Sequence, residues 1–330
     1  MTNTNTPDTT VGVVGVGSMG QNHARVYREL PSATLVGVAD ADEKQAREVA
    51  EKHGVAAMSL DDLLDAVDAV SIAAPTQYHY DIAEKAIDRG VHLLVEKPFV
   101  DDIDRGWDLV ERADDAGVTL QVGHIERFNP AVVTLRDIAS SLDIIAIDAH
   151  RLGPPVDRDI THNVVYDLMI HDIDVLLSLA EGEITSLSAS SALEDRYVTA
   201  TAEFDSGLIG TLTASRVTQQ KVRTLSINAE DCWVDIDYLT QSVEIHRRSV
   251  PEYIERNGDV RYRHESIVEH PNVVQGEPLR FELEAFVEAV ETGETPVVSG
   301  EDGMRALEIA TRIDQQTTRR QSAGETTQTQ

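Results

Sequence analysis

Short apolar runs alternate with helical patterns over the first 125 residues of the chain. Continuous apolar runs are typical of parallel strands that are covered on both faces of a sheet. The helical segments end before Pro31 or at Gly54, Gly90 and Gly117, where left-handed helix ends are expected. The predicted strands cover residues 11–14, 34–39, 69–73, 92–95 and 118–122. We therefore predict a doubly wound Rossmann domain of the α/β class over residues 1–125.

The second half of the chain has a different rhythm. One long helical pattern covers residues 164–180, and alternating apolar and polar positions then predict an antiparallel sheet. The turn signal Asp205-Ser206-Gly207 lies between two such stretches, 197–204 and 208–217. Further strands are predicted at 225–229, 233–238 and 242–246, and helices at 278–290 and 303–313. We predict an α+β domain over residues 126–330 with a large, open, mainly antiparallel sheet, and disorder in the polar tail 321–330.

The chain is strongly acidic. Its 330 residues include 58 Asp and Glu against 28 Lys and Arg, giving a formal net charge of -30, and only five residues are lysine. This charge repels nucleic acid and anionic membranes, so we expect neither as a partner. Dense like charge also destabilises a compact state unless salt screens it, which favours a protein from a halophile.

The cysteine count and the lack of apparent targeting signals indicate the cellular compartment of the protein. Residues 1–10 are polar and contain no apolar core of a secretory signal. No apolar run approaches the roughly 18 residues that span a bilayer. The single cysteine, Cys232, excludes an internal disulfide and fits a reducing compartment. We expect a soluble, cytoplasmic protein, and we assign no residue to a metal.

A glycine-rich turn follows the first predicted strand and opens the first predicted helix. In a dinucleotide site such glycines allow a tight turn and a close approach of the backbone to the pyrophosphate, while the helix N-terminus attracts the phosphates. Asp40 lies twenty residues beyond the turn, where a carboxylate accepts hydrogen bonds from the adenosine ribose. No arginine follows Asp40, so we expect NAD as the cofactor rather than NADP. The cofactor-binding residues assigned to the turn are Gly15, Gly17, Ser18, Met19 and Gly20.

Another group of candidates follows the strand predicted at 69–73. Ligands of open α/β sheets bind outside the carboxyl ends of the strands, and Ala74, Pro75 and Thr76 occupy that place. His79 in the same loop either faces the cofactor or lies partly exposed in the first turn of a helix. We assign all four residues to the cofactor site.

Glu96 and Lys97 stand at the end of the next predicted strand. A lysine is unusual in this composition, and this one lies at the edge of the sheet where the cofactor is expected. The alternative is a surface lysine held by Glu96. We assign both residues to the cofactor site, and Lys97 also to the reacting substrate.

The helix predicted at 164–180 carries a carboxylate and an imidazole one turn apart. Asp167, His171 and Asp174 share one side, opposite an apolar stripe. A histidine titrates near neutrality and can take a hydroxyl proton as hydride leaves carbon. The alternative is the solvated face of an amphipathic helix. The predicted apolar stripe consists of Val165, Met169, Ile173 and Leu176.

These motifs together resemble the glucose-fructose oxidoreductase, inositol dehydrogenase and rhizopine-catabolism family, written Gfo/Idh/MocA. The resemblance runs from the glycine turn through Glu96-Lys97-Pro98 to the helix with Asp167 and His171. It implies an NAD(P)-dependent dehydrogenase of sugars or polyols with Lys97 and His171 in the active site and Asp167 orienting one of them. It also implies a homodimer or homotetramer formed through the C-terminal sheet.

The stretches 122–130 and 149–154 are similar to the subgroup that includes UDP-N-acetylglucosamine 3-dehydrogenases. That resemblance implies oxidation of the C3 hydroxyl of a nucleotide sugar. His124, Arg127, Asn129 and Arg151 are then expected to bind substrate, along with Lys97, Asp167 and His171. The two arginines would suit a diphosphate, because guanidinium groups bind phosphate oxygens in pairs. Alternatively, they balance nearby carboxylates such as Glu126 and Asp148.

Two other functions stay open at this point. A free-sugar or polyol dehydrogenase of the inositol, glucose or xylose type would make the two arginines irrelevant. A non-catalytic protein that binds a dinucleotide and acts as a regulator would need neither Lys97 nor His171.

Overall fold

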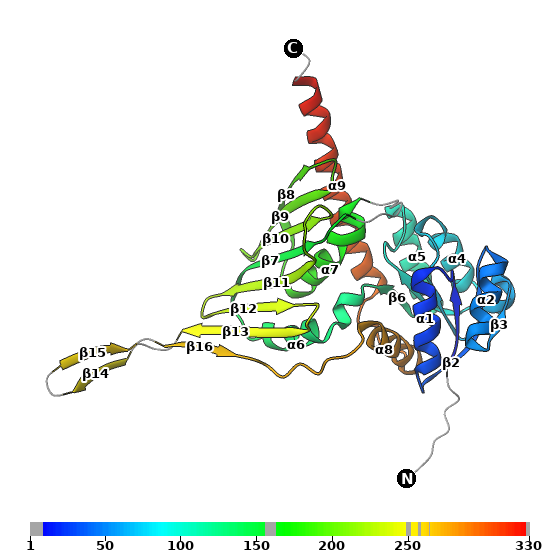
Figure 1. Ribbon diagram of the computed structural model, residues 1–330. Coiled ribbons are helices and arrows are strands. Elements are labelled where there is room, and N and C mark those ends of the chain that lie inside the picture. Colours follow the sequence, from blue (N-terminus) through cyan, green and yellow to red (C-terminus); the bar gives the residue numbers. More distant parts are fainter. Residues whose placement is uncertain (1–8, 156–162, 249–251, 257–258, 264, 328–330) are drawn as a thin grey trace, which may run out of the picture. The chain divides into compact units, whose positions relative to one another are not determined.

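The computed structural model describes residues 9–155, 163–248, 252–256, 259–263 and 265–327 (Figure 1). Its contacts divide the chain into two compact units. The first consists of Met1–Phe128 and Gly276–Glu308, and the second of Asn129–Gln275 and Ile309–Gln330. Among the described residues, no helix is long and apolar enough to cross a membrane.

The first unit contains a six-stranded parallel sheet with the order β3-β2-β1-β4-β5-β6. Each of the five predicted strands is present, so the Rossmann prediction is confirmed. The short strand β3, which the apolar pattern did not indicate, adds an edge beside β2. The strands are β1 (Thr9–Val14), β2 (Ala33–Ala39), β3 (Ala56–Ala57), β4 (Ala69–Ile72), β5 (His92–Glu96) and β6 (Leu120–Gly123).

Helices cover both faces of this sheet (Figure 1). On one face lie α1 (Ser18–Glu29), α2 (Glu43–His53) and α8 (Pro278–Thr292); on the other lie α3 (Leu60–Leu64), α4 (His79–Ile87) and α5 (Ile103–Ala116). The predicted left-handed helix ends are confirmed at Gly54 and Gly117. At the other ends, the side chains of Asp42 and Ser59 accept backbone N–H groups and cap α2 and α3.

Helix α8 is far from the other helices of its unit in sequence, yet it completes their core. Leu283 and Phe286 are fully buried in the cluster that contains Val13 of β1 and Tyr27 of α1. The chain then runs along the sheet edge, where the N–H of Val122 in β6 donates to the carbonyl of Val298 at 3.1 Å. Periodicity predicts such a helix but not the sheet on which it packs.

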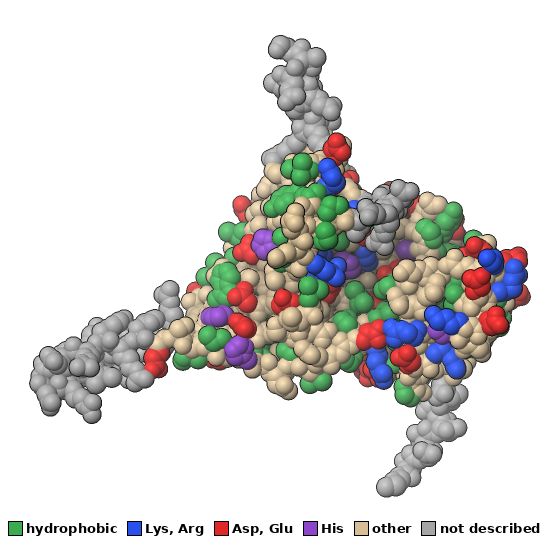
Figure 2. Space-filling model, viewed as in Figure 1, with side chains coloured by type: hydrophobic (Ala, Val, Ile, Leu, Met, Phe, Trp, Pro, Cys, Tyr) green, Lys and Arg blue, Asp and Glu red, His purple; other side chains and the backbone are tan. Residues whose placement is uncertain are grey.

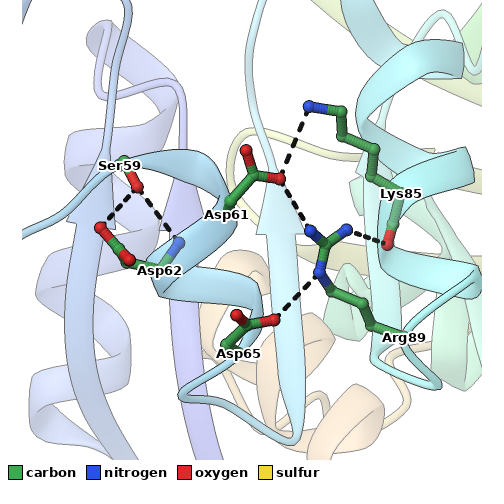
Figure 3. Close-up of polar contacts among 6 residues, drawn as sticks. All are labelled: Ser59, Asp61, Asp62, Asp65, Lys85 and Arg89. Atoms are coloured by element: carbon green, nitrogen blue, oxygen red, sulfur yellow. Dashed lines mark hydrogen bonds and ion pairs between the residues drawn. The ribbon is translucent and has the colours of Figure 1, made fainter.

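Surface arginines in the first unit order several of its acidic side chains. Figure 2 shows Asp and Glu beside Lys and Arg over this unit on the face in view. In Figure 3, Arg89 after α4 donates to Asp61 of α3 at 2.8 Å and to Asp65, the C-cap residue of α3, at 3.0 Å. Lys85 of α4 lies 3.6 Å from Asp61. The network therefore ties α3 to α4 through exposed ion pairs.

The second unit contains an eight-stranded sheet with the order β16-β13-β12-β11-β7-β10-β9-β8. All neighbouring strands are antiparallel except β7 and β10, which run parallel. The predicted hairpin with Gly207 at its turn is confirmed as β9 and β10. The strands are β7 (Ile144–Leu152), β8 (Ile184–Ala192), β9 (Tyr197–Phe204), β10 (Ile209–Ser215), β11 (Val222–Ala229), β12 (Cys232–Asp237), β13 (Ser242–Arg248) and β16 (Ser266–Glu269).

One face of this sheet packs against α6 (Pro130–Ala139) and α7 (Ile170–Leu179) (Figure 1). Along β9 the positions toward these helices are buried, whereas Thr199 and Thr201 on the other face are half-buried and Glu203 is exposed. A separate hairpin of β14 (Glu252–Arg256) and β15 (Asp259–Arg263) follows β13. Helix α9 (Gly300–Thr327) continues into the tail for which the sequence predicted disorder, and residues 328–330 lie outside the described residues.

Candidate active site

The glycine turn after β1 has the geometry of a dinucleotide site. Gly15 has a φ of 82°, and a Cβ there would lie 2.5 Å from the backbone nitrogen of Ala74. A Cβ on Gly20 would lie 1.8 Å from the carbonyl oxygen of Gly15. A Cβ on Gly17 would meet no protein atom within 4 Å, so protein packing does not explain that glycine.

The start of α1 fits a bound phosphate. Gly17 is the N-cap residue and makes no side-chain capping bond, and no acidic residue lies in the first turn. Ser18 is exposed and Met19 half-buried. Uncapped N–H groups and the helix dipole at such an end attract phosphate oxygens. This end of α1 would therefore hold the pyrophosphate of a dinucleotide.

Asp40 follows β2 and serves the turn itself. Its Oδ2 accepts the N–H of Val16 at 2.7 Å, and its Oδ1 accepts the N–H of Asp42 at 2.8 Å. Each carboxylate oxygen has a second lone pair that can accept a ribose hydroxyl. Asp40 thus stabilises the glycine turn and can still accept hydrogen bonds from the ribose hydroxyls of NAD.

His79 is buried, so the expectation of partial exposure is wrong. One ring nitrogen lies 2.7 Å from the carbonyl oxygen of Ala74, and the other lies 3.1 and 3.0 Å from those of Pro98 and Phe99. The imidazole therefore joins the loop after β4 to the loop after β5. In the loop after β4, Pro75 is exposed and Thr76 is buried in a 3-10 turn.

Glu96 is the last residue of β5 and is buried. Its Oε1 lies 3.0 Å from Nε2 of His23 on α1, and its Oε2 accepts the backbone N–H of Lys97 at 3.2 Å. Lys97 is half-buried and precedes a cis peptide bond to Pro98. The carboxylate thus holds the backbone of Lys97 and a buried histidine, which differs from the surface ion pair that the alternative interpretation required.

His124 follows β6 and is 1% exposed. Within the described part of the chain neither ring nitrogen has a hydrogen-bond partner. Burial lowers the pKa of His124 to about 3, and the charges of Arg127 and Lys97 act in the same direction. This imidazole is therefore neutral at physiological pH.

The two arginines expected to bind a diphosphate are buried beside carboxylates. Arg127 is 6% exposed, and its guanidinium lies 3.4 Å from Asp302 and donates to the carbonyl of Val297 at 3.2 Å. Arg151 makes two bonds of 2.8 Å with Asp172. Both arginines thus pair with carboxylates, Asp302 and Asp172, that lie outside the local stretches of sequence from which the alternative interpretation took Glu126 and Asp148 as examples. Phosphate binding by the two arginines stays a prediction.

Asn129 begins α6. Its Oδ1 accepts the N–H of Ala131 at 3.1 Å as an N-cap, with Pro130 in the first turn, and its Nδ2 donates to the carbonyl of Tyr238 at 3.1 Å. The ring of Tyr238 also lies 5.3 Å from the guanidinium carbon of Arg151. The side chain of Asn129 is thus used in placing α6, and its contact with substrate stays a prediction.

The segment with Asp167 and His171 is not one regular α-helix. Residues Val165–Met169 form a π-helical turn, which leads into α7. The Oδ1 of Asn163 caps this turn by accepting the N–H groups of Val165 and Tyr166. Such turns are rare and often occur at functional sites. The predicted apolar stripe is confirmed as buried, whereas the alternative of a solvated face is wrong at Asp174, which is 3% exposed.

Asp167 forms an ion pair with Arg216, a partner that sequence reasoning missed. The side chains of Asp167 and Arg216 are 26% and 13% exposed, so the pair is largely shielded from water. Arg216 lies directly after β10, and no local spacing links it to the helix. His171 is half-buried at the start of α7. Among the described residues, no group of three or more His, Cys, Asp or Glu could hold a metal ion.

Comparison with known proteins gives the family. Residues 9–124 match the oxidoreductase family with an NAD-binding Rossmann fold, and residues 148–235 match the GFO/IDH/MocA C-terminal domain. The chain therefore belongs to the Gfo/Idh/MocA family of oxidoreductases, with NAD as the cofactor of its Rossmann fold.

Individual relatives are similar over nearly the whole chain. UDP-N-acetylglucosamine 3-dehydrogenase of Acidithiobacillus ferrooxidans is 34% identical over 310 residues, which cover 92% of this chain and 95% of that enzyme. A solved structure of UDP-N-acetylglucosamine 3-dehydrogenase from the same species has a TM-score of 0.85 at 31% identity and covers 94% of this chain and 98% of its own. The scyllo-inositol 2-dehydrogenase (NAD(+)) of Bacillus subtilis is 29% identical over 338 residues and covers 90% of each chain.

Proposed function

We propose that the protein oxidises the C3 hydroxyl of UDP-N-acetylglucosamine to a ketone with NAD. One observation carries the dehydrogenase part. Lys97 lies at the carboxyl end of β5, in the sheet whose β1 leads into the glycine turn and the uncapped start of α1. The nucleotide sugar is supported by the relative from Acidithiobacillus ferrooxidans and by the similarity of residues 122–130 to its subgroup.

The roles of the side chains follow from the chemistry of alcohol oxidation. NAD, when bound, accepts the hydride that leaves carbon. We propose that His171 takes the hydroxyl proton as general base and that the ammonium of Lys97 stabilises the developing negative charge on the oxygen. Asp167, held by Arg216, would orient the turn that leads to His171.

Appearance of NADH absorbance with UDP-N-acetylglucosamine tests this function. Reduction of the product with borodeuteride and mass analysis would place the label at C3. UDP-glucose, free glucose and inositols serve as competitors. Turnover of inositol but not of any nucleotide sugar would replace the proposal by polyol oxidation. Binding of NAD with no turnover of any sugar would favour a regulator.

The cofactor preference can be tested at Asp40. A carboxylate in this place repels the 2′-phosphate of NADP, so we propose a preference for NAD. Asp40→Ala would also remove the acceptor for the N–H of Val16. Asp40→Asn keeps an acceptor oxygen and removes the charge. It should therefore lower the ratio of kcat/KM for NAD to kcat/KM for NADP, and it should disturb the glycine turn less than Asp40→Ala. A wild-type preference for NADP would contradict this.

We also propose that the protein works in the cytoplasm at high salt and as a homodimer or homotetramer. The net charge of -30 supports the salt requirement, because mobile ions screen repulsion between carboxylates. The partly exposed face of the eight-stranded sheet, with Thr199 and Thr201 of β9, supports assembly through that face. Light scattering in molar KCl would measure the assembly, and Thr201→Arg should weaken it.

A further inference from the structure

A buried histidine on α1 contacts the residue that precedes Lys97. His23 is 0% exposed, and its Nε2 lies 3.0 Å from Oε1 of Glu96. The other oxygen of Glu96 accepts the N–H of Lys97 at 3.2 Å. One carboxylate therefore bridges a side chain of α1 and the backbone of Lys97.

The register of the sheet keeps room for this bridge. Glu96 pairs with Gly123 in β6. A Cβ on Gly123 would lie 3.1 Å from the carboxyl carbon and from Oε2 of Glu96, closer than side-chain contacts normally come. Glycine at this position thus leaves room for the carboxylate of Glu96 beside β6.

The bridge is hard to explain by stability alone. A buried carboxylate and imidazole must give up hydration, and well-packed apolar residues of similar volume are often at least as stable as a buried ionic pair. His23 also lies on the helix whose N-terminus fits the pyrophosphate, little more than one turn beyond Ser18. The bridge therefore connects the phosphate-binding helix to the strand end that carries the lysine.

We propose that His23 is a positioning residue for the reaction. Acting through Glu96, it fixes the backbone of Lys97 with respect to the glycine turn and so holds the ammonium at the substrate oxygen. This inference rests on the catalytic role proposed above for Lys97. His79 holds the carbonyls of Pro98 and Phe99 on the other side of the lysine, so the segment is tied on both sides.

The test compares His23→Leu, His23→Gln and a matched control, Tyr27→Phe. Tyr27 is on the same helix, is fully buried, and bonds to Ser71 at 2.8 Å, so its change removes one buried hydrogen bond away from Lys97. Because small misplacements of a reacting group reduce rates steeply, His23→Leu should lower kcat by roughly 10²-fold with little change in NAD affinity. His23→Gln keeps a donor and should recover most of kcat, while Tyr27→Phe should retain it.

A readout independent of turnover comes from the low lysine content. The chain has five lysines, so a sample labelled only at lysine gives a resonance for Lys97 that Lys97→Arg identifies. His23→Leu and His23→Gln should shift or broaden this resonance to different extents, with Gln nearer to wild type. Tyr27→Phe should leave it in place. If His23→Leu does not fold, the Lys97 resonance still decides, because His23→Gln should shift or broaden it while Tyr27→Phe should not.

The outcomes separate this inference from the proposed function. If Lys97→Ala is inactive while His23→Leu and His23→Gln keep full turnover and an unchanged Lys97 resonance, the positioning role is overturned and the catalytic role stands. If Tyr27→Phe lowers kcat as much as His23→Leu, the effect is general loss of stability and the inference is also overturned. If Lys97→Ala keeps full turnover, both proposals fail. In the Lys97→Ala background, His23→Leu should have no further effect on kcat.

Discussion

The end of β5 and the π-helical turn before α7 carry the two proposed catalytic side chains, and they are built differently. At the end of β5 the backbone around Lys97 is tied by Glu96 and His79, so the strand itself sets the position of the lysine. At the π turn, the carboxylate of Asp167 is held by Arg216, the residue directly after β10. A residue at a strand end is positioned by the register of that strand in the sheet. A residue in a helical turn is positioned by the helical geometry of the turn and by the side chains that contact it.

The largest effect is expected from substitutions that remove the proposed catalytic group of each region. Lys97→Ala and His171→Ala should each lower turnover by about 10² to 10⁴, because the groups act as the hydroxyl proton and the hydride leave. NAD affinity should stay nearly unchanged in His171→Ala, and NAD titration of Lys97→Ala measures what Lys97 contributes to cofactor binding. The double variant should lose much less than the product of the two single losses, since residues that act as a unit are not additive. Stopped-flow NADH absorbance and NAD titration measure both quantities.

Matched controls are available in each unit. Lys85 is a surface lysine on α4, and His150 is an exposed histidine on β7. Their alanine variants should keep turnover. Full activity of both Lys97→Ala and His171→Ala would remove the catalytic assignment from both regions and leave the carboxylate and imidazole of the second unit as structural groups.

A smaller effect is expected when the partner of the π turn is removed. Arg216→Ala leaves Asp167 without this cation, so turnover should fall roughly tenfold through misplacement of the turn. A double-mutant cycle of Asp167→Asn with Arg216→Ala should show a coupling of roughly 0.5–3 kcal/mol in the activation free energy. Arg196→Ala, an exposed arginine in the turn before β9, is the control. A cycle with no coupling would mean that the pair has no part in positioning.

His124 gives a pH prediction for the strand-end region. Its folded pKa of about 3 lies below the ordinary value of 6.5, so below pH 6.5 the unfolded chain binds a proton that the folded chain excludes. The free energy of unfolding should therefore decrease as the pH is lowered, by about 2 kcal/mol from pH 7 to pH 5 from this group alone. His124→Leu should show a correspondingly shallower loss in denaturant titrations, while His150→Leu should match wild type. Parallel curves for all three proteins would contradict a buried neutral imidazole.

The smallest expected effect lies outside both regions, in the ion pairs of Arg89. The carboxylates of Asp61 and Asp65 are more than half exposed, so Arg89→Ala should lower the free energy of unfolding by no more than about 1 kcal/mol. The difference should be measurable in dilute buffer and vanish in molar KCl, because salt screens exposed pairs. Turnover at high salt should not change. A difference that persists in molar KCl would show that the network acts through packing.

The sequence predicted the parallel strands and the glycine ends of helices because both depend on local patterns. Buried parallel strands are continuous in apolar character, and glycine takes the left-handed conformation of a helix end without strain. The partners of Arg127, Arg151 and Asp167 could not be predicted, since each pair joins segments that meet only in the folded unit.

Two further features were beyond local reasoning. The π turn changes which side chains share a face, so the burial of Asp174 did not follow from a period of 3.6 residues. The parallel pairing of β7 with β10 depends on strand order rather than on apolar pattern. His23 was missed for the same reason, because an internal helix position gives no sign of the strand end it contacts.

The return of α8 to the first unit has a consequence for how the chain is made. Leu283, Phe286 and Val287 belong to the same core as Val13 and Tyr27, yet every strand of the second unit is synthesised before them. On the ribosome, the nucleotide-binding sheet therefore emerges with part of one face exposed, and that part is covered only when α8 has been synthesised. Burial of each such side chain contributes about 1.5–3 kcal/mol, so the nascent sheet stays weak until then. Chaperone binding to the unfinished chain should accordingly persist until residues 278–292 have left the ribosome.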